Sequence, residues 1–331
     1  MNLTTTNIKS LISDKAKELG FVKIGFAKYE VLENESEKLR HWLDLGYDAD
    51  MEWVKKGFDK RKDIRLIMED AKSVISLAFN YYTPFEHDET KPKISRYAWG
   101  KDYHKVLRKK LKELCEFIKT IPLNPPFNQR GDKRSAGGFI TRAYVDDGSV
   151  MDKVWAQKAG IGWMGKHTNI INPEYGSWIF LCEIITNIDF EIYDSPIEDL
   201  CGSCSLCVSA CPTGAITEEY VVDANKCISY QTIENRGEIP AEINLDGWIF
   251  GCDVCQDICP YNSPKYNHVT DDTSFYPLQI ALPLTKGEYP QGEGVKQLEA
   301  ITEEEFNVIF ADSPIKRTKY KGWKRNLALT P

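Results

Sequence analysis

The stretch CGSCSLCVSACP at residues 201–212 contains four cysteines, the last of which precedes a proline. Two residues separate each of the first three cysteines, and three residues separate the third from the fourth. This spacing is typical of bacterial ferredoxins, in which the first three cysteines bind one 4Fe–4S cluster and the fourth binds another. The stretch therefore predicts a ferredoxin-like domain with two iron–sulfur clusters.

A second block follows the same pattern but lacks one cysteine. It contains Cys252, Cys255 and Cys259, again ending in Cys-Pro, and Cys227 is the obvious replacement for the missing ligand. The predicted ligands of the first cluster are Cys201, Cys204, Cys207 and Cys259. The predicted ligands of the second cluster are Cys211, Cys227, Cys252 and Cys255. Zinc is the alternative, since CxxC pairs also build zinc sites, but a zinc ribbon has no need of the Cys-x3-Cys-Pro endings.

The cysteine content also bears on the cellular compartment. Eight of the ten cysteines lie between Cys201 and Cys259, and we expect Cys115 and Cys182 to be small buried residues. Residues 1–10 show no signal sequence, and no apolar run reaches the roughly 20 residues that span a bilayer. We therefore expect a cytoplasmic protein without a membrane partner, in which clustered cysteines bind metal rather than form disulfides.

The charge is acidic overall and uneven along the chain. A net charge of −7 argues against a protein that coats nucleic acid by bulk electrostatics. Residues 313–331 form a basic tail without an acidic side chain, whose cations are Lys316, Arg317, Lys319, Lys321, Lys324 and Arg325. Such a segment either grips a phosphate backbone or is simply a solvated surface.

Hydrophobic periodicity predicts alternating helices and strands before the cysteines. Helices are expected at residues 8–19, 33–45, 103–119 and 151–159, and strands at 22–27, 74–79, 138–145 and 177–185. This alternation favours an α/β or α+β domain around a central sheet, with no indication of strand order. The predicted domains are residues 1–193, residues 194–265 with the clusters, and a C-terminal extension of residues 266–331 that carries the basic tail.

Three short motifs have a structural and a functional interpretation. Residues 160–165 match G-x-G-x-x-G. A dinucleotide site is not expected there, because a helical pattern rather than a strand precedes the motif. The loop is nevertheless suited to line a pocket for a large cofactor. Asp102-Tyr103-His104 begins a cobalt-binding signature that fails at Leu107, so His104 is expected to be a helix-end or packing residue. Asp146-Asp147-Gly148 is either a turn with a helix cap or a proton-donating acid at the end of a strand.

Several motifs in a fixed order give the chain a wider resemblance. They are RYAWGKDYH at 96–104, YVDDG at 144–148, AGIGW at 159–163, PEYGS at 173–177, EIIT at 183–186, CIS at 227–229 and FGCD at 250–253. Together with the cysteine blocks they resemble the epoxyqueuosine reductases, cobalamin-dependent enzymes that act on tRNA. The resemblance covers nearly the whole chain.

The resemblance implies a fold, cofactors and site residues. It implies a cobalamin-binding α/β domain related to reductive dehalogenases, followed by the domain with two 4Fe–4S clusters. The cobalamin would be base-off, without a protein ligand on cobalt, and Asp146 would be the proton donor. The implied cobalamin contacts are Arg61, Ser95, Ile170, Leu181, Ser229, Cys252 and Asp253.

The same resemblance implies the reaction and the partners. The expected reaction is reduction of epoxyqueuosine to queuosine at the wobble position of tRNA, through Co(I) cobalamin fed by the clusters. The expected partners are the anticodon stem-loop of tRNA and an unidentified low-potential electron donor, and a monomer is expected.

This sequence departs from the family pattern at two places. Asp147 stands where many members have Thr or Ser. We also expect no C-terminal helical-repeat domain of the kind that many members use to hold tRNA. Two alternatives remain open at this point: a dehalogenase-like corrinoid reductase of a small molecule, and a ferredoxin-type electron carrier.

Overall fold

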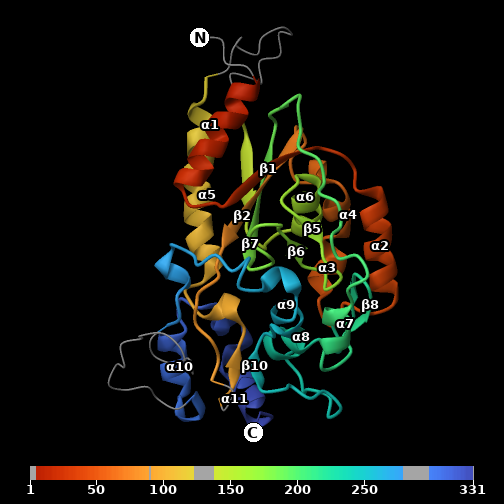
Figure 1. Ribbon diagram of the computed structural model, residues 1–331, viewed down its shortest axis with the longest axis vertical. Coiled ribbons are helices and arrows are strands. Elements are labelled where there is room, and N and C mark those ends of the chain that lie inside the picture. The colour runs from red at the N-terminus through yellow and green to blue at the C-terminus, as the bar shows by residue number, and fades with distance from the viewer. Residues whose placement is uncertain (1–4, 89–90, 123–137, 279–297, 331) are drawn as a thin grey trace.

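A four-stranded antiparallel sheet organises the first part of the chain, as the computed structural model shows (Figure 1). The structure describes residues 5–88, 91–122, 138–278 and 298–330. The strands lie in the order β1 (Lys23–Lys28), β2 (Ser73–Asn80), β7 (Ile179–Thr186) and β4 (Thr141–Tyr144). β2 and β7 pair along eight residues each, and every residue of β2 is buried.

Helices cover both faces of this sheet because its central strands are apolar on both sides. On one face lie α1 (Thr5–Glu18) and α5 (Tyr103–Thr120), and on the other lies α6 (Asp152–Lys158) (Figure 1). Side chains of a strand alternate between faces. Accordingly, Ile75 and Leu77 pack with α1 and α5, whereas Val74 and Ala78 pack with α6.

Shorter elements complete the body. The helices are α2 (Glu33–Asp44), α3 (Glu52–Lys56), α4 (Phe58–Lys62), α7 (Leu206–Ala210), α8 (Ile228–Ile233), α9 (Val254–Asp257), α10 (Glu303–Ile309) and α11 (Lys319–Ala328). The strands are β3 (Lys93–Ile94), β5 (Trp163–Met164), β6 (Ile170–Ile171), β8 (Ile216–Glu218), β9 (Val221–Val222) and β10 (Trp248–Phe250). Short 3-10 turns lie at Ile64–Leu66, Arg96–Ala98, Pro260–Asn262, Thr273–Phe275, Leu298–Ala300 and Pro314–Thr318.

The C-terminal segment packs against the cysteine region. Trp323 of α11 is fully buried in an apolar cluster that also contains Trp99 and Phe250. The Asn326 amide donates to the carbonyls of Thr232 and Ile249 at 2.9 and 2.8 Å. The basic tail is therefore a packed helix, which the sequence did not indicate.

Most of the sequence-based expectations for the fold are met. The mixed α/β class is confirmed, and the helices and strands lie within a few residues of their predicted bounds, except that the strand expected at 138–145 is limited to β4. Cys115 and Cys182 are buried, and the ring of His104 stacks on Tyr103 at a centroid distance of 4.1 Å. Among the described residues, no helix is long and apolar enough to cross a membrane. The domain boundaries stay predictions.

The contact between β1 and α6 provides a test of this packing. A methyl group added to Gly25 would lie 1.9 Å from the Ala159 carbonyl oxygen, so Gly25→Ala must push β1 away from α6. We expect a decrease of about 1–3 kcal/mol in the free energy of unfolding, measured by chemical denaturation. Gly138→Ala is the control, since the nearest atom to its added methyl group would be 3.7 Å away. Equal stability of both variants would contradict the packing described.

Candidate functional site

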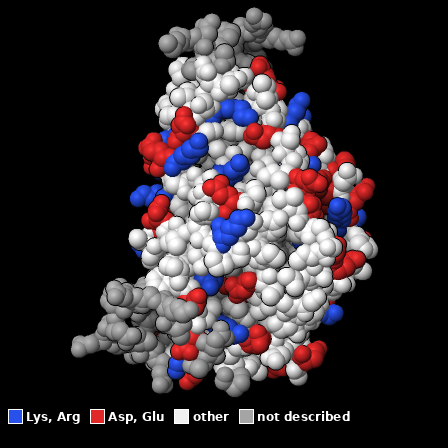
Figure 2. Space-filling view, in the orientation of Figure 1, with Lys and Arg blue, Asp and Glu red and all other residues white. Residues whose placement is uncertain are grey.

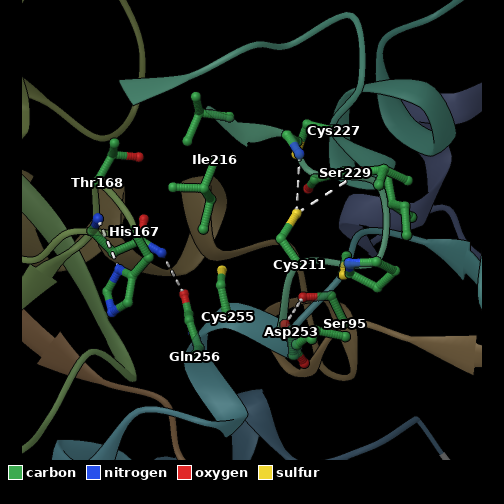
Figure 3. A pocket seen from close by; sticks show the side chains of 18 of the residues that line it. Ser95, His167, Thr168, Cys211, Ile216, Cys227, Ser229, Asp253, Cys255 and Gln256 are labelled. Carbon is green, nitrogen blue, oxygen red and sulfur yellow. Dashed lines mark hydrogen bonds between the residues drawn. The ribbon is translucent and has the colours of Figure 1, made fainter. Parts of the chain in front are cut away.

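A cavity in the described part of the chain, the larger of two that contain cysteines, brings together four cysteines from distant parts of the sequence (Figure 3). It has a volume of about 300 Å³. Its wall contains Cys211, Cys227, Cys252 and Cys255. These residues lie at or near the ends of α7, α8 and α9, short helices that converge here. They are the four cysteines that the sequence assigns to the second cluster.

A smaller cavity of about 40 Å³ contains the other four cysteines. They are Cys201, Cys204, Cys207 and Cys259. Cys259 comes from the second cysteine block and joins three residues of the first block. The two cavities thus divide the eight cysteines as the ferredoxin spacing predicts, although the ligand assignment itself stays a prediction.

The chemistry of these thiols suits metal binding coupled to proton release. Burial raises the pKa of Cys227 and of Cys255 above the usual value for a thiol, and it raises the pKa of Cys259 to about 11. The free thiols are therefore protonated at neutral pH. Because the thiolate is the metal ligand, loading these sites must displace protons.

The larger cavity has room that the smaller one lacks. Its volume is about 300 Å³, against about 40 Å³ for the smaller cavity, although each contains four cysteines. Ser95, Ser229 and Asp253 border this space together with aliphatic side chains such as Ile216 (Figure 3). A mixed wall of hydroxyl and aliphatic groups suits a corrin, whose ring is apolar and whose rim carries amides.

One acid in this wall connects two parts of the chain. Both oxygens of the Asp253 carboxylate accept hydrogen bonds, one from the Ser95 hydroxyl and one from the Arg96 amide at 2.7 Å. Asp253 and Ser95 are nearly fully buried. These bonds fix the second cysteine block against the segment that follows β3.

Three of the implied cobalamin contacts lie outside this wall. Ile170 on β6 is buried in the apolar cluster around α6, and Leu181 on β7 packs against the same cluster. The Arg61 guanidinium donates to the carbonyls of Trp53 and Val54 at 3.3 and 3.4 Å. The structure therefore brings together only Ser95, Ser229, Cys252 and Asp253 of the seven.

Asp146 lies just beyond the end of β4 and is exposed. Its Oδ2 accepts a hydrogen bond from the hydroxyl of Tyr103, at the start of α5. Burial, and next the charge of Asp146, raises the pKa of Tyr103 well above its usual value, so the phenol keeps its proton and remains a donor. The Tyr103 ring stacks on Phe180 at a centroid distance of 4.4 Å, which fixes the position of the hydroxyl.

Asp147, the acid next to Asp146, has different interaction partners. One oxygen of Asp147 accepts from the Val145 amide at 2.8 Å, and the other forms an ion pair with Arg108. Asp147 therefore closes the turn, whereas Asp146 has φ +49°, in the left-handed region that non-glycine residues seldom adopt. Such backbone strain is often found at functional positions.

Two acids, Glu183 and the partly buried Asp152, lie close to Asp146. Glu183 of β7 is fully buried and accepts from the Ser76 hydroxyl at 3.2 Å. Burial, and next the charge of Asp152, raises the pKa of Glu183, and burial raises the pKa of Asp152 to about 6. The pair is therefore uncharged in part at neutral pH and limits the negative charge around Asp146.

Lys153 connects Asp146 with the larger cavity. Its side chain lines that cavity and donates to the Asn169 amide oxygen at 3.0 Å. Its ammonium group lies close enough to Asp146 for their charges to interact, and it would also attract Cys227 and Cys255 once these are thiolates. The proton-donating candidate is thus near the cavity that has the extra room.

Three residues at these sites, Tyr103, Lys153 and His167, were not assigned a role from the sequence, whereas Trp163 belongs to the loop that was expected to line a pocket. Tyr103 holds Asp146, Lys153 lines the larger cavity, and His167 lines both cavities. The Trp163 indole nitrogen lies 3.5 Å from Cys201 Sγ. Trp163 and His167 belong to the run GWMGKH, so the expected pocket-lining role of this loop was the available signal.

The placement of the possible metal ligands can be compared with what a zinc ion requires. A single zinc ion needs its four ligands at about 2.0–2.3 Å from one point. Among the residues that the structure describes, no group of three or more His, Cys, Asp or Glu side chains is placed to hold one metal ion. The two sets of cysteines surround cavities instead.

Two family models match the chain. One, described as epoxyqueuosine reductase QueG, DUF1730, matches residues 61–146. The other, described as a 4Fe-4S double cluster binding domain, matches residues 200–262 and so includes all eight clustered cysteines.

Curated relatives resemble the chain along nearly its whole length. The epoxyqueuosine reductase of Cellulophaga algicola is 44% identical over 319 residues, which are 96% of each chain. That of Synechocystis sp. is 43% identical over 310 residues, which are 92% of this chain and 98% of the relative.

Solved structures show the same fold. A crystal structure of epoxyqueuosine reductase with an epoxyqueuosine-modified tRNA-Tyr stem loop has a TM-score of 0.83 at 32% identity, covering 99% of this chain and 81% of that one. A structure of the Bacillus subtilis enzyme, with its catalytic aspartate loop swung out of the active site, has a TM-score of 0.80 at 31% identity and covers 99% and 82%.

Iron content tests the division of the cysteines. Two 4Fe–4S clusters give about eight irons per chain. We expect Cys227→Ala to reduce this to about four, because only the larger cavity is deprived of a ligand. Cys115→Ala and Cys182→Ala are the controls and should keep the full iron content, since both cysteines lie in the apolar core. The measurement is iron and acid-labile sulfide after anaerobic purification, and an unchanged content in Cys227→Ala would contradict the assignment.

Proposed function

This chain belongs to the epoxyqueuosine reductase family, and on that basis we propose that it reduces epoxyqueuosine to queuosine in tRNA with Asp146 as the proton donor. The observation that supports this role is the position of Asp146, an exposed acid held by a buried tyrosine beside the cavity of the second set of cysteines.

The reaction converts an epoxide into an alkene. Two electrons and two protons are consumed, both carbon–oxygen bonds of the oxirane are broken, and the oxygen leaves as water. When bound, the clusters supply single electrons and base-off cobalamin supplies a nucleophilic cobalt. The protein provides binding, orientation and a proton at the opening oxygen.

Asp146 delivers the proton from the oxygen that Tyr103 leaves free. The Tyr103 hydroxyl occupies Oδ2, so Oδ1 carries the proton toward the oxirane oxygen as its bond to carbon breaks. The positive φ at Asp146 and the hydrogen bond from Tyr103 keep the acid close to Lys153 at the rim of the cavity. The swung-out loop of the Bacillus subtilis enzyme supports a movable turn at residues 144–148.

The two cavities are adjacent, which supports a path for electrons from one cluster to the other. His167 lines both, so the two sets of cysteines adjoin. The larger cavity also contains the space in which Ser95, Ser229, Cys252 and Asp253 would hold cobalamin. An electron from an unidentified low-potential donor would enter at the first cluster and leave from the second.

Side chains near Asp146 are suited to bind the anticodon loop of tRNA. The wobble base is in a single-stranded loop, and such bases are commonly splayed out and stacked on aromatic side chains. Tyr97, which is partly exposed, lies at a centroid distance of 6.0 Å from Tyr103, and Arg317 is close enough to Asp146 for their charges to interact. On the face shown in Figure 2, basic and acidic side chains are interspersed, so binding there would rest on local contacts.

The basic tail contributes fewer free cations than its sequence suggests. Arg317 forms an ion pair with Glu234, and Arg325 donates to the carbonyls of Gln231 and Asn235. Lys316 and Lys324 also donate to backbone carbonyls. Lys319 and Lys321 are exposed and make no ion pair within the described part of the chain, so we propose these two as phosphate contacts.

Membership of this family also decides between the alternatives. Full-length similarity to epoxyqueuosine reductases leaves no support for a dehalogenase-like enzyme or a simple electron carrier. A cytoplasmic location follows from the tRNA substrate and remains part of the proposal, as does a monomeric state.

Substitution of the two adjacent acids tests the proton donor. We expect Asp146→Asn to lower single-turnover reduction of epoxyqueuosine-tRNA by at least about 100-fold, because an amide cannot donate the proton that the opening oxygen needs. Iron content and tRNA affinity should stay unchanged. Asp147→Asn is the matched control and should keep most of the activity. If Asp147→Asn is the inactive variant, the roles of the two acids are reversed.

Charge removal tests the tRNA surface. The double variant Lys319→Ala, Lys321→Ala should bind tRNA more weakly, and the slope of log K against log salt should fall by about 1 for each lysine that binds a phosphate. The control removes the same charge from Lys17 and Lys23, exposed residues in α1 and β1 that lie away from α11 (Figure 1). Fluorescence anisotropy with a labelled anticodon stem-loop measures both, and equal effects would exclude a specific role for α11.

A further inference from the structure

We propose that His167 is a positioning residue for the first iron–sulfur cluster, to whose sulfur its Nε2–H donates a hydrogen bond that raises the reduction potential of that cluster. The proposal concerns the cluster bound by Cys201, Cys204, Cys207 and Cys259. It rests on the proposed pair of clusters, and it does not depend on the substrate.

The proton of the neutral imidazole is on Nε2. The Asn169 amide donates a hydrogen bond to His167 Nδ1 at 3.2 Å, so Nδ1 is the acceptor nitrogen. A neutral imidazole has one acceptor and one donor nitrogen. His167 therefore directs its single N–H through Nε2.

This donor is buried without an acceptor. The His167 side chain is only 3% exposed, and Nε2 has no hydrogen-bond partner among the described residues. Burying an N–H without an acceptor costs free energy, and native proteins rarely leave such a group unsatisfied. The unpaired N–H thus indicates a group that the protein binds at this place.

The ring belongs to the wall of the smaller cavity. A methyl group on Gly165 would meet Ile171 Cδ1 at 2.6 Å and His167 Cε1, the ring atom between the two nitrogens, at 3.0 Å. Both side chains therefore lie against the same glycine. Ile171 lines the smaller cavity and packs with Trp163 and Cys259. In the larger cavity, by contrast, the ring lies on the side opposite Cys211 and Cys227 (Figure 3).

Two neighbours in the same segment already bind the first cysteine block. The Trp163 indole N–H lies 3.5 Å from Cys201 Sγ. The Lys166 ammonium donates to the Gly202 carbonyl at 2.7 Å and pairs with Glu219 at 2.6 Å, although its side chain is only 5% exposed. The segment 163–167 is thus held against this block, and His167 completes a set of donors directed at it.

A hydrogen bond to cluster sulfur stabilises the more negative, reduced form. Hydrogen bonds to the sulfurs are among the factors that set the potentials of iron–sulfur clusters. Removal of this bond must therefore make the first cluster harder to reduce. The Thr213 hydroxyl, 3.8 Å from Cys211 Sγ, occupies a comparable place at the larger cavity and provides a control.

The test is an EPR-monitored reductive titration of the anaerobically purified chain, after its iron has been measured. In His167→Phe, which keeps an aromatic ring and lacks the donor, we expect the reduced-to-oxidised ratio of one cluster to fall about tenfold at a fixed potential, or about 59 mV. His167→Gln, which restores an N–H donor, should recover most of the shift. Thr213→Val should leave that transition unchanged.

The outcomes separate this inference from the proposed function. A chain without iron overturns both. A chain with both clusters whose potentials do not change in His167→Phe overturns this inference alone. An equal shift of the same transition in Thr213→Val also overturns it, because the effect would then not be specific to the donor at the smaller cavity.

A second measurement uses the unsubstituted chain, so that the proposal can still be tested if a variant fails to bind iron. With isotopically labelled histidine, pulsed EPR of the reduced chain should show a weak coupling between a histidine nitrogen and one cluster. Absence of that coupling overturns the proposal.

Discussion

The pairing of β2 with β7 is the constraint on which the site depends. The two strands are joined over eight residues each and lie between α1 and α5 on one face and α6 on the other. Because their backbone polar groups are removed from water, their hydrogen bonds must be made within the sheet. The register is therefore fixed, and with it the positions of Phe180 and Glu183 on β7.

The positions around Asp146 follow from that register. β4 pairs with the same strand, so Tyr144 lies opposite Glu183 and the next turn carries Asp146 over the start of α5. Phe180 stacks on Tyr103, whose hydroxyl then meets the acid. An exposed carboxyl group on a strained turn is thus positioned by a rigid aromatic contact with the sheet.

The sequence predicts the local features of this chain better than those that depend on its three-dimensional folding. Helices such as α1 and α5 follow from apolar periodicity, and the division of the cysteines follows from their spacing. The order β1-β2-β7-β4 does not, because a strand's composition does not identify its neighbour. Tyr103 and Asp146 are 43 residues apart, and only the sheet brings them together. The packing of α11 was likewise not predictable, because its cations dominate the composition while Trp323 and Asn326 make the contacts.

Each set of four cysteines contains members of both cysteine blocks, and this determines when during synthesis a set is complete. Cys259 completes the set that begins at Cys201, and Asn326 secures the carbonyls of Thr232 and Ile249 beside the other set. A growing polypeptide emerges from the ribosome N-terminal end first, and its early domains fold first. The four-stranded sheet has all its strands by Thr186, whereas neither cysteine set has all four members until synthesis has passed residue 254. A complete set of four cysteines therefore exists only after every strand of the sheet has been synthesised.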